Sequence, residues 1–386
     1  MSASAAPLDR NFARRVDQVV DGAIEERRIV GAVILVARRG EILYGRAAGF
    51  ADREANEPMR QDAIFRLASV TKPIVATAAL ALVEAGAIDL ADPVTKFIPE
   101  FRPKLADGSE PVLNIRHLLT HTAGLDYGFR QPTGGPYQRA GISDGLDQPG
   151  LSSAENLRRI ASVPLSFAPG AGWGYSVAMD VLGEAMARAT DETLPDLADR
   201  LVARPLGMSD TSFIVRDQAR LVRPYADGPG GAVAMGEHHL VPFGDGAISF
   251  TPGRAFDPTS FASGGTGMNG TTGDVLKLLE ALRRADGTVI RPETAAAMTR
   301  DAIEGLATTM PGWGWGLGFG VLRDPVVAAT PQAPGTWRWG GVYGHSWFVD
   351  PTLDLTVVAL TNTAIAGMTG AFPDALRDAI YGRRAG

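Results

Sequence analysis

The sequence contains no cysteine among its 386 residues. This absence excludes disulfide bonds, cysteine nucleophiles, thiolate zinc sites and iron–sulfur clusters. Lysine is also scarce, because only Lys72, Lys96, Lys104 and Lys277 interrupt an otherwise arginine-based set of 37 basic residues. Arginine stays protonated in proteins, whereas a buried lysine can lose its proton. A lysine that acts as a base must therefore be one of these four.

The sequence also lacks a long apolar run and an excess of positive charge. Its longest mostly apolar stretch, residues 73–83, is too short to span a bilayer. The first twenty residues are charged and lack the apolar core of a signal peptide. A net charge of −6 disfavours nucleic acid as a partner. We therefore expect a soluble, cytoplasmic protein without a membrane or nucleic-acid partner, and the sequence leaves its oligomeric state open.

Apolar residues make up 45% and charged residues 21% of the chain, as in ordinary folded domains. Apolar runs that are continuous or alternating predict strands at 32–37, 42–48, 316–322, 335–339, 344–350 and 355–361, with a turn at Arg39-Gly40. Apolar residues at helical spacing predict helices at 8–28, 69–85, 115–120, 154–161, 176–189, 195–203, 272–284 and 374–381. The strands thus lie at the two ends of the chain, with most of the helices between them.

This distribution predicts an α+β fold. We expect an antiparallel sheet formed from both chain ends and flanked by helices, together with a mainly helical inserted domain. The predicted sheet domain comprises residues 1–65 and 260–386, and the helical domain comprises residues 66–259. An active site is expected at the interface of the two.

The most informative local motif is Ser69-Val70-Thr71-Lys72, at the start of the apolar helix predicted for 69–85. Side chains three residues apart lie on one face of a helix. The helix dipole and an apolar environment both disfavour a charged amine at this position. The pKa of Lys72 is therefore expected to fall toward neutrality, as a general base requires. The structural alternative is an exposed lysine beside a helix-capping serine.

Two glycine motifs and a histidine pair have structural explanations. Residues 141–145 match Gly-x-Ser-x-Gly, but a nucleophile there needs a strand before Ser143 and a helix after it, and the flanks resemble loops. Residues 265–270 match Gly-x-Gly-x-x-Gly without a preceding strand, which favours close backbone packing. His117 and His121 lack the glutamate of a zinc-protease motif. We expect these histidines to be buried and hydrogen-bonded, and we expect no metal site.

Five segments together resemble the family VIII carboxylesterases, which are esterases with a serine β-lactamase and penicillin-binding-protein fold. They occur in the order of that family, from about residue 30 to the C-terminal end. The segments are FRLASVTK at 65–72, HLLTHTAGL at 117–125, PGAGWGYS at 169–176, SGGTGM at 263–268 and WGGVYGHS at 339–346.

The resemblance implies that Ser69 is the nucleophile, Lys72 its base and Tyr175 the partner of the lysine in proton transfer. It also implies an oxyanion hole made of the backbone N–H groups of Ser69 and Val342. The expected activity is that of a serine carboxylesterase that forms an acyl-enzyme with a small-molecule ester and needs no cofactor. The substrate pocket is expected to contain Tyr127, Trp173, Val177, Trp339, Gly340, Gly341, Tyr343 and His345.

Two departures from the β-lactamase pattern indicate the kind of substrate. Val177 occupies the asparagine position of the Tyr-x-Asn motif, and Trp339 occupies the lysine position of Lys-Thr-Gly. A site for a charged acid would pair it with a cation. We therefore expect short-chain, neutral esters as substrates, with acyl transfer and weak β-lactam hydrolysis as side activities.

Three alternatives to the esterase hypothesis remain at this point. One is a β-lactamase or a D-amino-acid peptidase or amidase with the same Ser-x-x-Lys site. The second is a non-catalytic penicillin-binding sensor, which would be acylated without turnover. The third is a structural protein with a degenerate site, which the presence of Ser69, Lys72 and Tyr175 disfavours.

Overall fold

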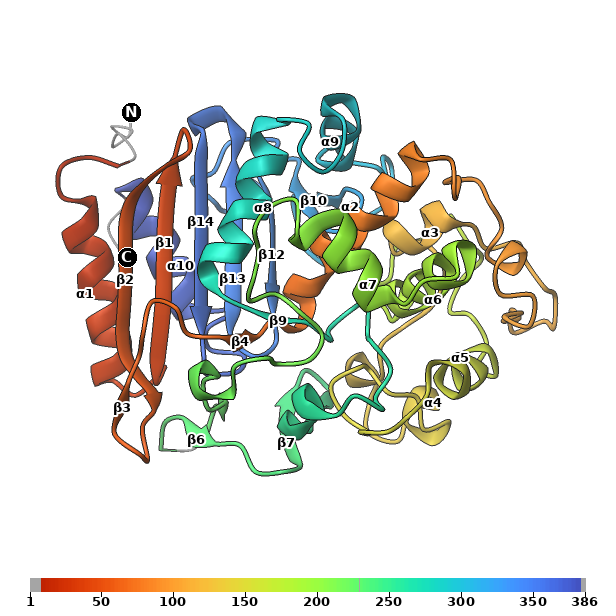
Figure 1. Ribbon diagram of the computed structural model, residues 1–386, viewed down its shortest axis with the longest axis horizontal. Helices are drawn as coiled ribbons and strands as arrows, with labels where there is room; N and C mark the ends of the chain where they lie inside the picture. Colours follow the sequence, from red (N-terminus) through yellow and green to blue (C-terminus); the bar gives the residue numbers. More distant parts are fainter. Residues whose placement is uncertain (1–7, 229, 383–386) are drawn as a thin grey trace.

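An eight-stranded antiparallel sheet, built from both ends of the chain, forms one half of the protein (Figure 1). The structure is a computed structural model that describes residues 8–228 and 230–382, so sequence predictions for the other residues lie outside the described part. β1 and β14 join the two halves of the sheet, with Ala32 opposite Thr361 and Arg38 opposite Leu355. Across the sheet the strands follow as β10 (Trp313–Trp315), β11 (Gly320–Leu322), β12 (Trp337–Gly341), β13 (His345–Asp350), β14 (Leu355–Thr361), β1 (Gly31–Arg38), β2 (Glu41–Asp52) and β3 (Glu57–Pro58).

The first hairpin follows directly from the sequence. Arg39 and Gly40 connect β1 to β2 and have φ angles of 55° and 85°. Two successive residues with positive φ form the tight turn whose twist matches that of a hairpin. The turn and the two strands predicted here are confirmed, although β2 extends to Asp52.

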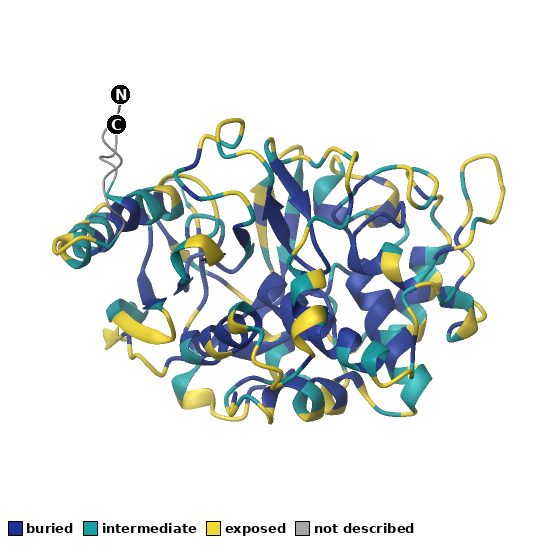
Figure 2. Cartoon of the chain, turned by 90° about the horizontal axis from the view of Figure 1, so that it is seen from above, coloured by how far each residue is buried: buried dark blue, intermediate teal, exposed yellow. Residues whose placement is uncertain are grey.

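Helices cover both faces of the sheet. α1 (Phe12–Glu25) and α10 (Ala371–Tyr381), from the two ends of the chain, pack against each other on one face. Their apolar side chains form a core with Ile34 and Phe348 of the sheet. α8 (Thr272–Arg284) contacts β14 and β1 from the other face. Figure 2 shows the buried residues concentrated between these layers.

The other helices gather beside the sheet, next to β10–β13 (Figure 1). α2 lies between them and the sheet and is buried along almost its whole length, as its apolar sequence predicts. The predicted α+β fold with a mainly helical part is confirmed. These helices are α2 (Thr71–Glu84), α3 (Ile115–Leu119), α4 (Pro136–Arg139), α5 (Ser153–Ala161), α6 (Ala178–Thr190), α7 (Leu194–Ala198) and, nearer the sheet, α9 (Pro292–Met298).

Several short elements differ from the sequence predictions. The predicted helix at 69–85 begins with a 3-10 turn, η1 (Ala68–Val70), and the predicted helix at 195–203 divides into α7 and a π-helical turn. Three strand pairs in the middle of the chain and β10 were not predicted, because such short strands depend on a partner that only the fold supplies. The pairs are β4 (Phe65–Arg66) with β9 (Asn269–Gly270), β5 (Tyr225–Ala226) with β6 (Val233–Ala234), and β7 (His239–Phe243) with β8 (Gly246–Phe250). The predicted domain boundaries stay a prediction.

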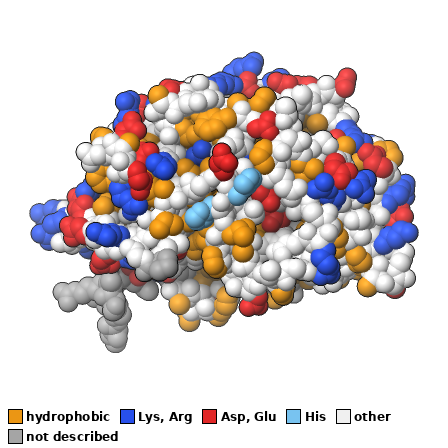
Figure 3. Space-filling view, turned by 90° about the horizontal axis from the view of Figure 1, so that it is seen from below, with side chains coloured by type: hydrophobic (Ala, Val, Ile, Leu, Met, Phe, Trp, Pro, Cys, Tyr) orange, Lys and Arg blue, Asp and Glu red, His pale blue; other side chains and the backbone are white. Residues whose placement is uncertain are grey.

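Acidic and basic side chains are intermixed over the face shown in Figure 3. Within residues 8–228 and 230–382, no helix combines the length and the apolarity that crossing a bilayer requires.

Candidate active site

Ser69 lies in η1, between the short strand β4 and the buried helix α2. The preceding residue, Ala68, has a φ of 45°, which costs energy for a residue with a Cβ. The Ser69 Oγ is 3.1 Å from the Lys72 Nζ and 2.7 Å from the Tyr175 hydroxyl oxygen. The structure therefore brings together the three residues for which the sequence predicts catalytic roles.

Lys72 is fully buried, so the alternative of an exposed lysine is wrong. Its Nζ lies 3.0 Å from the Tyr127 hydroxyl and 2.9 Å from the carbonyl oxygen of Gly265. Among the described residues no carboxylate forms an ion pair with it. Burial lowers the pKa of Lys72 to about 7, although the charges of Asp180 and Asp144 act in the opposite direction. A neutral amine beside Ser69 is thus accessible near neutral pH.

The loop that contains Gly265 supports Lys72 from behind. The Asp180 Oδ1 accepts hydrogen bonds from the Ser263 hydroxyl at 2.6 Å and from the Gly265 N–H at 2.9 Å. A Cβ at Gly265 would lie 2.8 Å from the Tyr127 hydroxyl, so a larger residue would push the loop away from the lysine. The Gly-x-Gly-x-x-Gly match therefore serves close backbone packing, as predicted. Sequence analysis missed Asp180, since an aspartate in an apolar helix carries no motif.

The hydroxyl of Tyr175 is held between Ser69 and Trp339. The Trp339 Nε1 donates a hydrogen bond to the Tyr175 oxygen at 3.1 Å. Because indole can only donate, the tyrosine must direct its own proton toward the Ser69 Oγ. Burial raises the pKa of Tyr175 well above its usual value, so the phenol stays protonated. The proton of Ser69 can then point at a neutral Lys72.

Trp339→Phe keeps an aromatic side chain but removes the N–H that orients Tyr175. We expect kcat to fall about 5- to 30-fold, the equivalent of one buried hydrogen bond of ~1–2 kcal/mol, with little change in KM. Steady-state kinetics on a neutral ester measure both constants. Trp337→Phe is the control, because Trp337 stacks on Phe319 in the core, at a ring distance of 4.9 Å. An unchanged kcat in Trp339→Phe would contradict the orienting role.

The backbone at Ser69 and Val342 leaves two N–H groups without a partner. Among the hydrogen bonds of the described residues, neither N–H has an acceptor. β12 approaches η1 closely, since a Cβ at Gly341 would lie only 2.4 Å from the Leu67 carbonyl oxygen. Glycine at this position lets the end of β12 pass against the turn that carries Ser69. Both residues line the same cavity, so both N–H groups are available to a ligand there, as an oxyanion hole requires.

A cavity of about 500 Å³ opens at Ser69. Three of the predicted pocket residues, Trp173, Trp339 and Gly340, line it. Aromatic side chains contribute much of its apolar surface, as in many small-molecule sites. The aromatic residues of the wall are Phe129, Trp173, Tyr175, Phe243, Trp339, Trp347 and Phe348.

Five predicted pocket residues do not line this cavity, which corrects the prediction. Tyr127 lies behind it and contacts Lys72, and Val177 is fully buried at the start of α6. Gly341 packs on the Leu67 carbonyl, and Tyr343 lines a separate cavity of about 100 Å³. The His345 Nε2 is 2.8 Å from the Arg66 carbonyl oxygen beneath β4. Ser346 and Trp347 of the same segment do line the cavity, whereas Tyr343 and His345 face away from it, so neighbours in a motif need not share a surface.

The serine of the second motif is part of a buried network. Ser143 is fully buried, and its hydroxyl donates to the Asp147 carboxylate at 2.6 Å. Asp144 accepts the N–H groups of Gly128 and Phe129, and burial raises its pKa to about 7. The Gly-x-Ser-x-Gly match is thus a loop, as predicted, and its serine does not reach the cavity.

His117 in α3 and His121 just after it are both hydrogen-bonded, as predicted, but only His121 is also fully buried. His117 is half-buried and forms a capping box with Asn114 at the start of the helix. His121 is fully buried, and its Nδ1 is 3.2 Å from the Ser176 hydroxyl oxygen. His121 also stacks near Tyr175, with ring centroids 4.9 Å apart. His121 therefore supports the loop that presents Tyr175, whereas His117 caps α3.

Comparisons with known proteins agree with this geometry. The beta-lactamase family model matches residues 13–380. Esterase EstB of Burkholderia gladioli is 55% identical over 378 residues, which are 97% of this chain and 96% of that protein. The solved structure of EstCE1, described as a hydrolase with promiscuous acyltransferase activity, has a TM-score of 0.93 and 44% identity, over 97% of this chain and 99% of that chain. A D-amino acid amidase from Ochrobactrum anthropi shares the fold, with a TM-score of 0.70 and 23% identity, over 97% of this chain and 100% of that chain.

Proposed function

Because the chain belongs to the beta-lactamase family, we propose that it is a serine carboxylesterase of the family VIII type, which hydrolyses short-chain, neutral esters through an acyl-enzyme. One observation carries the proposal: the Ser69 Oγ lies within hydrogen-bond distance of both the Lys72 amine and the Tyr175 hydroxyl. Its similarity to an esterase and to a hydrolase of known structure supports it.

In the acylation half-reaction Ser69 is the nucleophile and neutral Lys72 the base. Lys72 takes the hydroxyl proton as the Ser69 Oγ forms a bond to the ester carbonyl carbon. The negative charge that develops on the carbonyl oxygen is stabilised by the N–H groups of Ser69 and Val342, each worth about 3–4 kcal/mol in comparable sites. The tetrahedral intermediate collapses when the bond to the alkoxy oxygen breaks. Tyr175 gives its proton to the departing alkoxide and recovers one from Lys72.

In the deacylation half-reaction the same groups act on water. The base takes a proton from water as the water oxygen attacks the acyl carbon. The bond between this carbon and the Ser69 oxygen then breaks, and the Ser69 oxygen receives a proton. The sum is ester and water giving acid and alcohol. An alcohol or amine in place of water would receive the acyl group, so acyl transfer is part of the proposal.

The cavity beside Ser69 favours an uncharged, apolar acyl group. Trp339 and Trp173 contribute apolar surface where a β-lactam-binding site would need a cation. Val177 supplies no amide for a β-lactam side chain. A β-lactamase or a D-amino-acid peptidase or amidase with the same site is the second candidate, and weak β-lactam hydrolysis is included in the proposal. The cytoplasmic location stays a prediction.

The decisive experiment is intact-mass measurement after reaction with a fluorophosphonate, followed by peptide mapping. We expect one adduct on Ser69 and none on Ser143. Hydrolysis rates are then compared for 4-nitrophenyl esters from acetate to octanoate, the matching anilides and nitrocefin. These rates show whether esters, amides or β-lactams are the preferred substrates. Faster turnover of anilides or nitrocefin than of esters would favour the second candidate, and labelling of Ser143 would contradict the proposed nucleophile.

A further inference from the structure

Arg338 brings a positive charge into the wall of the cavity that opens at Ser69. It precedes Trp339 in β12, and its side chain lines the cavity at the end near α10. Its guanidinium carbon lies 4.0 Å from the centre of the Trp313 ring, so one face of the group is stacked. Among the described residues, the guanidinium of Arg338 has no hydrogen bond and no ion pair, whereas the neighbouring Arg377 has both. The N–H donors of Arg338 therefore have no acceptor in the described part of the protein.

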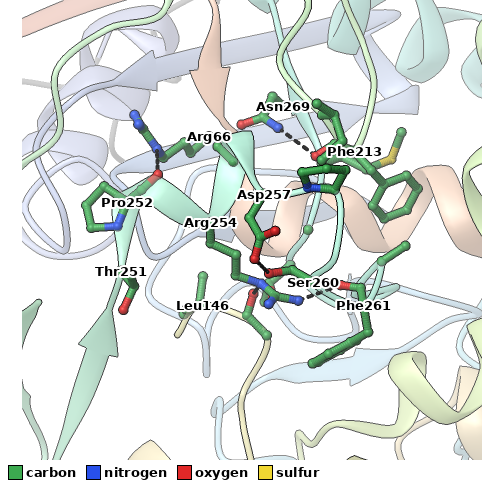
Figure 4. A pocket seen from close by; sticks show the side chains of 18 of the residues that line it. Arg66, Leu146, Phe213, Thr251, Pro252, Arg254, Asp257, Ser260, Phe261 and Asn269 are labelled. Carbon is green, nitrogen blue, oxygen red and sulfur yellow. Dashed lines mark hydrogen bonds between the residues drawn. The ribbon is translucent and has the colours of Figure 1, made fainter. Parts of the chain in front are cut away.

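Other arginines in comparable positions are satisfied. Figure 4 shows a smaller cavity in which Arg66 donates to the Pro252 carbonyl and Arg254 to the Phe261 carbonyl. These hydrogen bonds connect loops to one another and leave few guanidinium N–H groups free to bind a ligand. Beside Arg338, Arg377 pairs with Asp374 and Asp378, at 2.9 Å each. Among the described residues, the Arg338 guanidinium has neither a carbonyl oxygen nor a carboxylate as its partner.

A second donor without a partner lies in the same cavity wall. Gln332 is 3% exposed, and its Oε1 accepts a hydrogen bond from the Thr330 hydroxyl at 2.9 Å. Its Nε2 has no partner among the described residues. A buried donor without an acceptor costs free energy, so this group also favours a ligand that accepts hydrogen bonds.

The charge near Arg338 remains positive at neutral pH. Burial lowers the pKa of Arg338 to about 10, with Arg377 acting in the same direction and Asp374 in the opposite one. Asp374 also lines the cavity, but its side chain is 57% exposed and already pairs with Arg377. A planar guanidinium with one face stacked presents its N–H edge in the geometry that suits a carboxylate.

We propose that the cavity binds esters that carry a carboxylate remote from the scissile bond, and that Arg338, with Gln332, holds this carboxylate. The inference rests on the proposed function and names the substrate class of that same site. It is compatible with a neutral group beside Trp339, because successive side chains of a strand point to opposite faces, so that Arg338 and Trp339 contact different parts of a ligand. Arg338 is then a specificity-determining residue and takes no part in the bond changes.

The test compares matched esters with and without the remote carboxylate. The acyl series pairs mono-4-nitrophenyl adipate, suberate and sebacate with the alkanoate esters of equal chain length. The alcohol series pairs butanoate esters of ω-hydroxy acids with butanoates of plain alcohols. In at least one series we expect a lower KM for the carboxylate member, and a higher KM for it as salt is added.

Variants of Arg338 test whether this residue causes the lower KM of the carboxylate esters. Arg338→Met should raise KM for the preferred carboxylate ester about 10- to 100-fold, and should change KM for its neutral partner much less. Arg338→Lys should retain part of the preference. Arg158→Met, which removes an exposed arginine of α5, is the matched control. Equal KM values for both members of every pair, or an equal loss for both in Arg338→Met, would overturn the proposal.

A binding measurement separates this proposal from the proposed function. Calorimetric titration of Ser69→Ala with each pair of esters needs no turnover. Tighter binding of the carboxylate member, abolished by Arg338→Met, supports the inference even if the wild-type protein hydrolyses no ester. Hydrolysis without any such binding preference retains the proposed function and refutes the inference.

Discussion

Ser69→Ala is expected to lower kcat/KM for a neutral 4-nitrophenyl ester by about 10⁴- to 10⁶-fold, as the loss of a serine nucleophile does in other hydrolases. The variant keeps the N–H groups of the oxyanion hole and the cavity, so substrate binding should change little. It should also fail to form the fluorophosphonate adduct. Activity is measured with protein free of wild-type contamination, because a trace of wild type would mask so large a loss.

Ser143→Ala is the matched control, since it removes a serine hydroxyl outside the cavity. The variant leaves the Asp147 carboxylate without its 2.6 Å hydrogen bond from Ser143. We expect a loss of about 1–3 kcal/mol in the free energy of unfolding, with kcat/KM per folded molecule unchanged. A large loss of activity in folded Ser143→Ala, with an active Ser69→Ala, would reverse the assignment of the nucleophile.

Lys72→Met is expected to lower kcat/KM by about 10²- to 10⁴-fold, because the general base is lost. In the wild type the base must be neutral, and the pKa of Lys72 is lowered to about 7 by burial. Activity should therefore fall as the pH drops through about 7, with this pKa visible in the profile of kcat/KM. A pH–rate profile from pH 5 to 9 measures it, and an acid limb that persists unchanged in Lys72→Met would contradict the assignment.

The same lysine should make stability depend on pH. Because its pKa falls from 10.5 in the unfolded chain to about 7 in the fold, the unfolded state binds more protons between these values. The lysine thus destabilises the fold below pH 7, and this penalty disappears as the pH rises toward 10.5.

Denaturant unfolding of Lys72→Met and wild type at several pH values tests this linkage. The stability of Lys72→Met relative to wild type should decline by an amount on the order of 4 kcal/mol between neutral pH and pH 10. Lys104→Met, which removes an exposed lysine, controls for the loss of one charge. A pH-independent difference between Lys72→Met and wild type would show that the amine is charged in the fold near neutral pH.

The sequence predicted the elements whose pattern is local. The hairpin turn at Arg39-Gly40, the buried helix after Ser69 and β14 over residues 355–361 follow from turn chemistry and apolar periodicity. The short hairpin β7–β8 could not be recognised, because alternation over five residues is too weak a signal without its packing partner.

For the site, motif spacing and family resemblance selected Ser69, Lys72 and Tyr175, which the fold brings within hydrogen-bond distance. The pocket prediction was less accurate, since it treated neighbours in a motif as neighbours in the cavity. Tyr343 and His345 follow Trp339 in the sequence, yet both face away from the substrate side.

By itself the sequence determined the α+β fold and the scarcity of candidate bases, because these depend on composition and periodicity, and motif spacing together with the family resemblance selected the candidate catalytic residues. Only the tertiary structure decided what surrounds them. The Gly265 carbonyl behind Lys72, the indole N–H that orients Tyr175 and the guanidinium of Arg338 in the cavity wall arise where segments far apart in the chain meet. The pKa of a base depends on its burial, and the direction of a hydroxyl proton depends on its hydrogen-bond partners. Tertiary packing alone determines the burial and the partners.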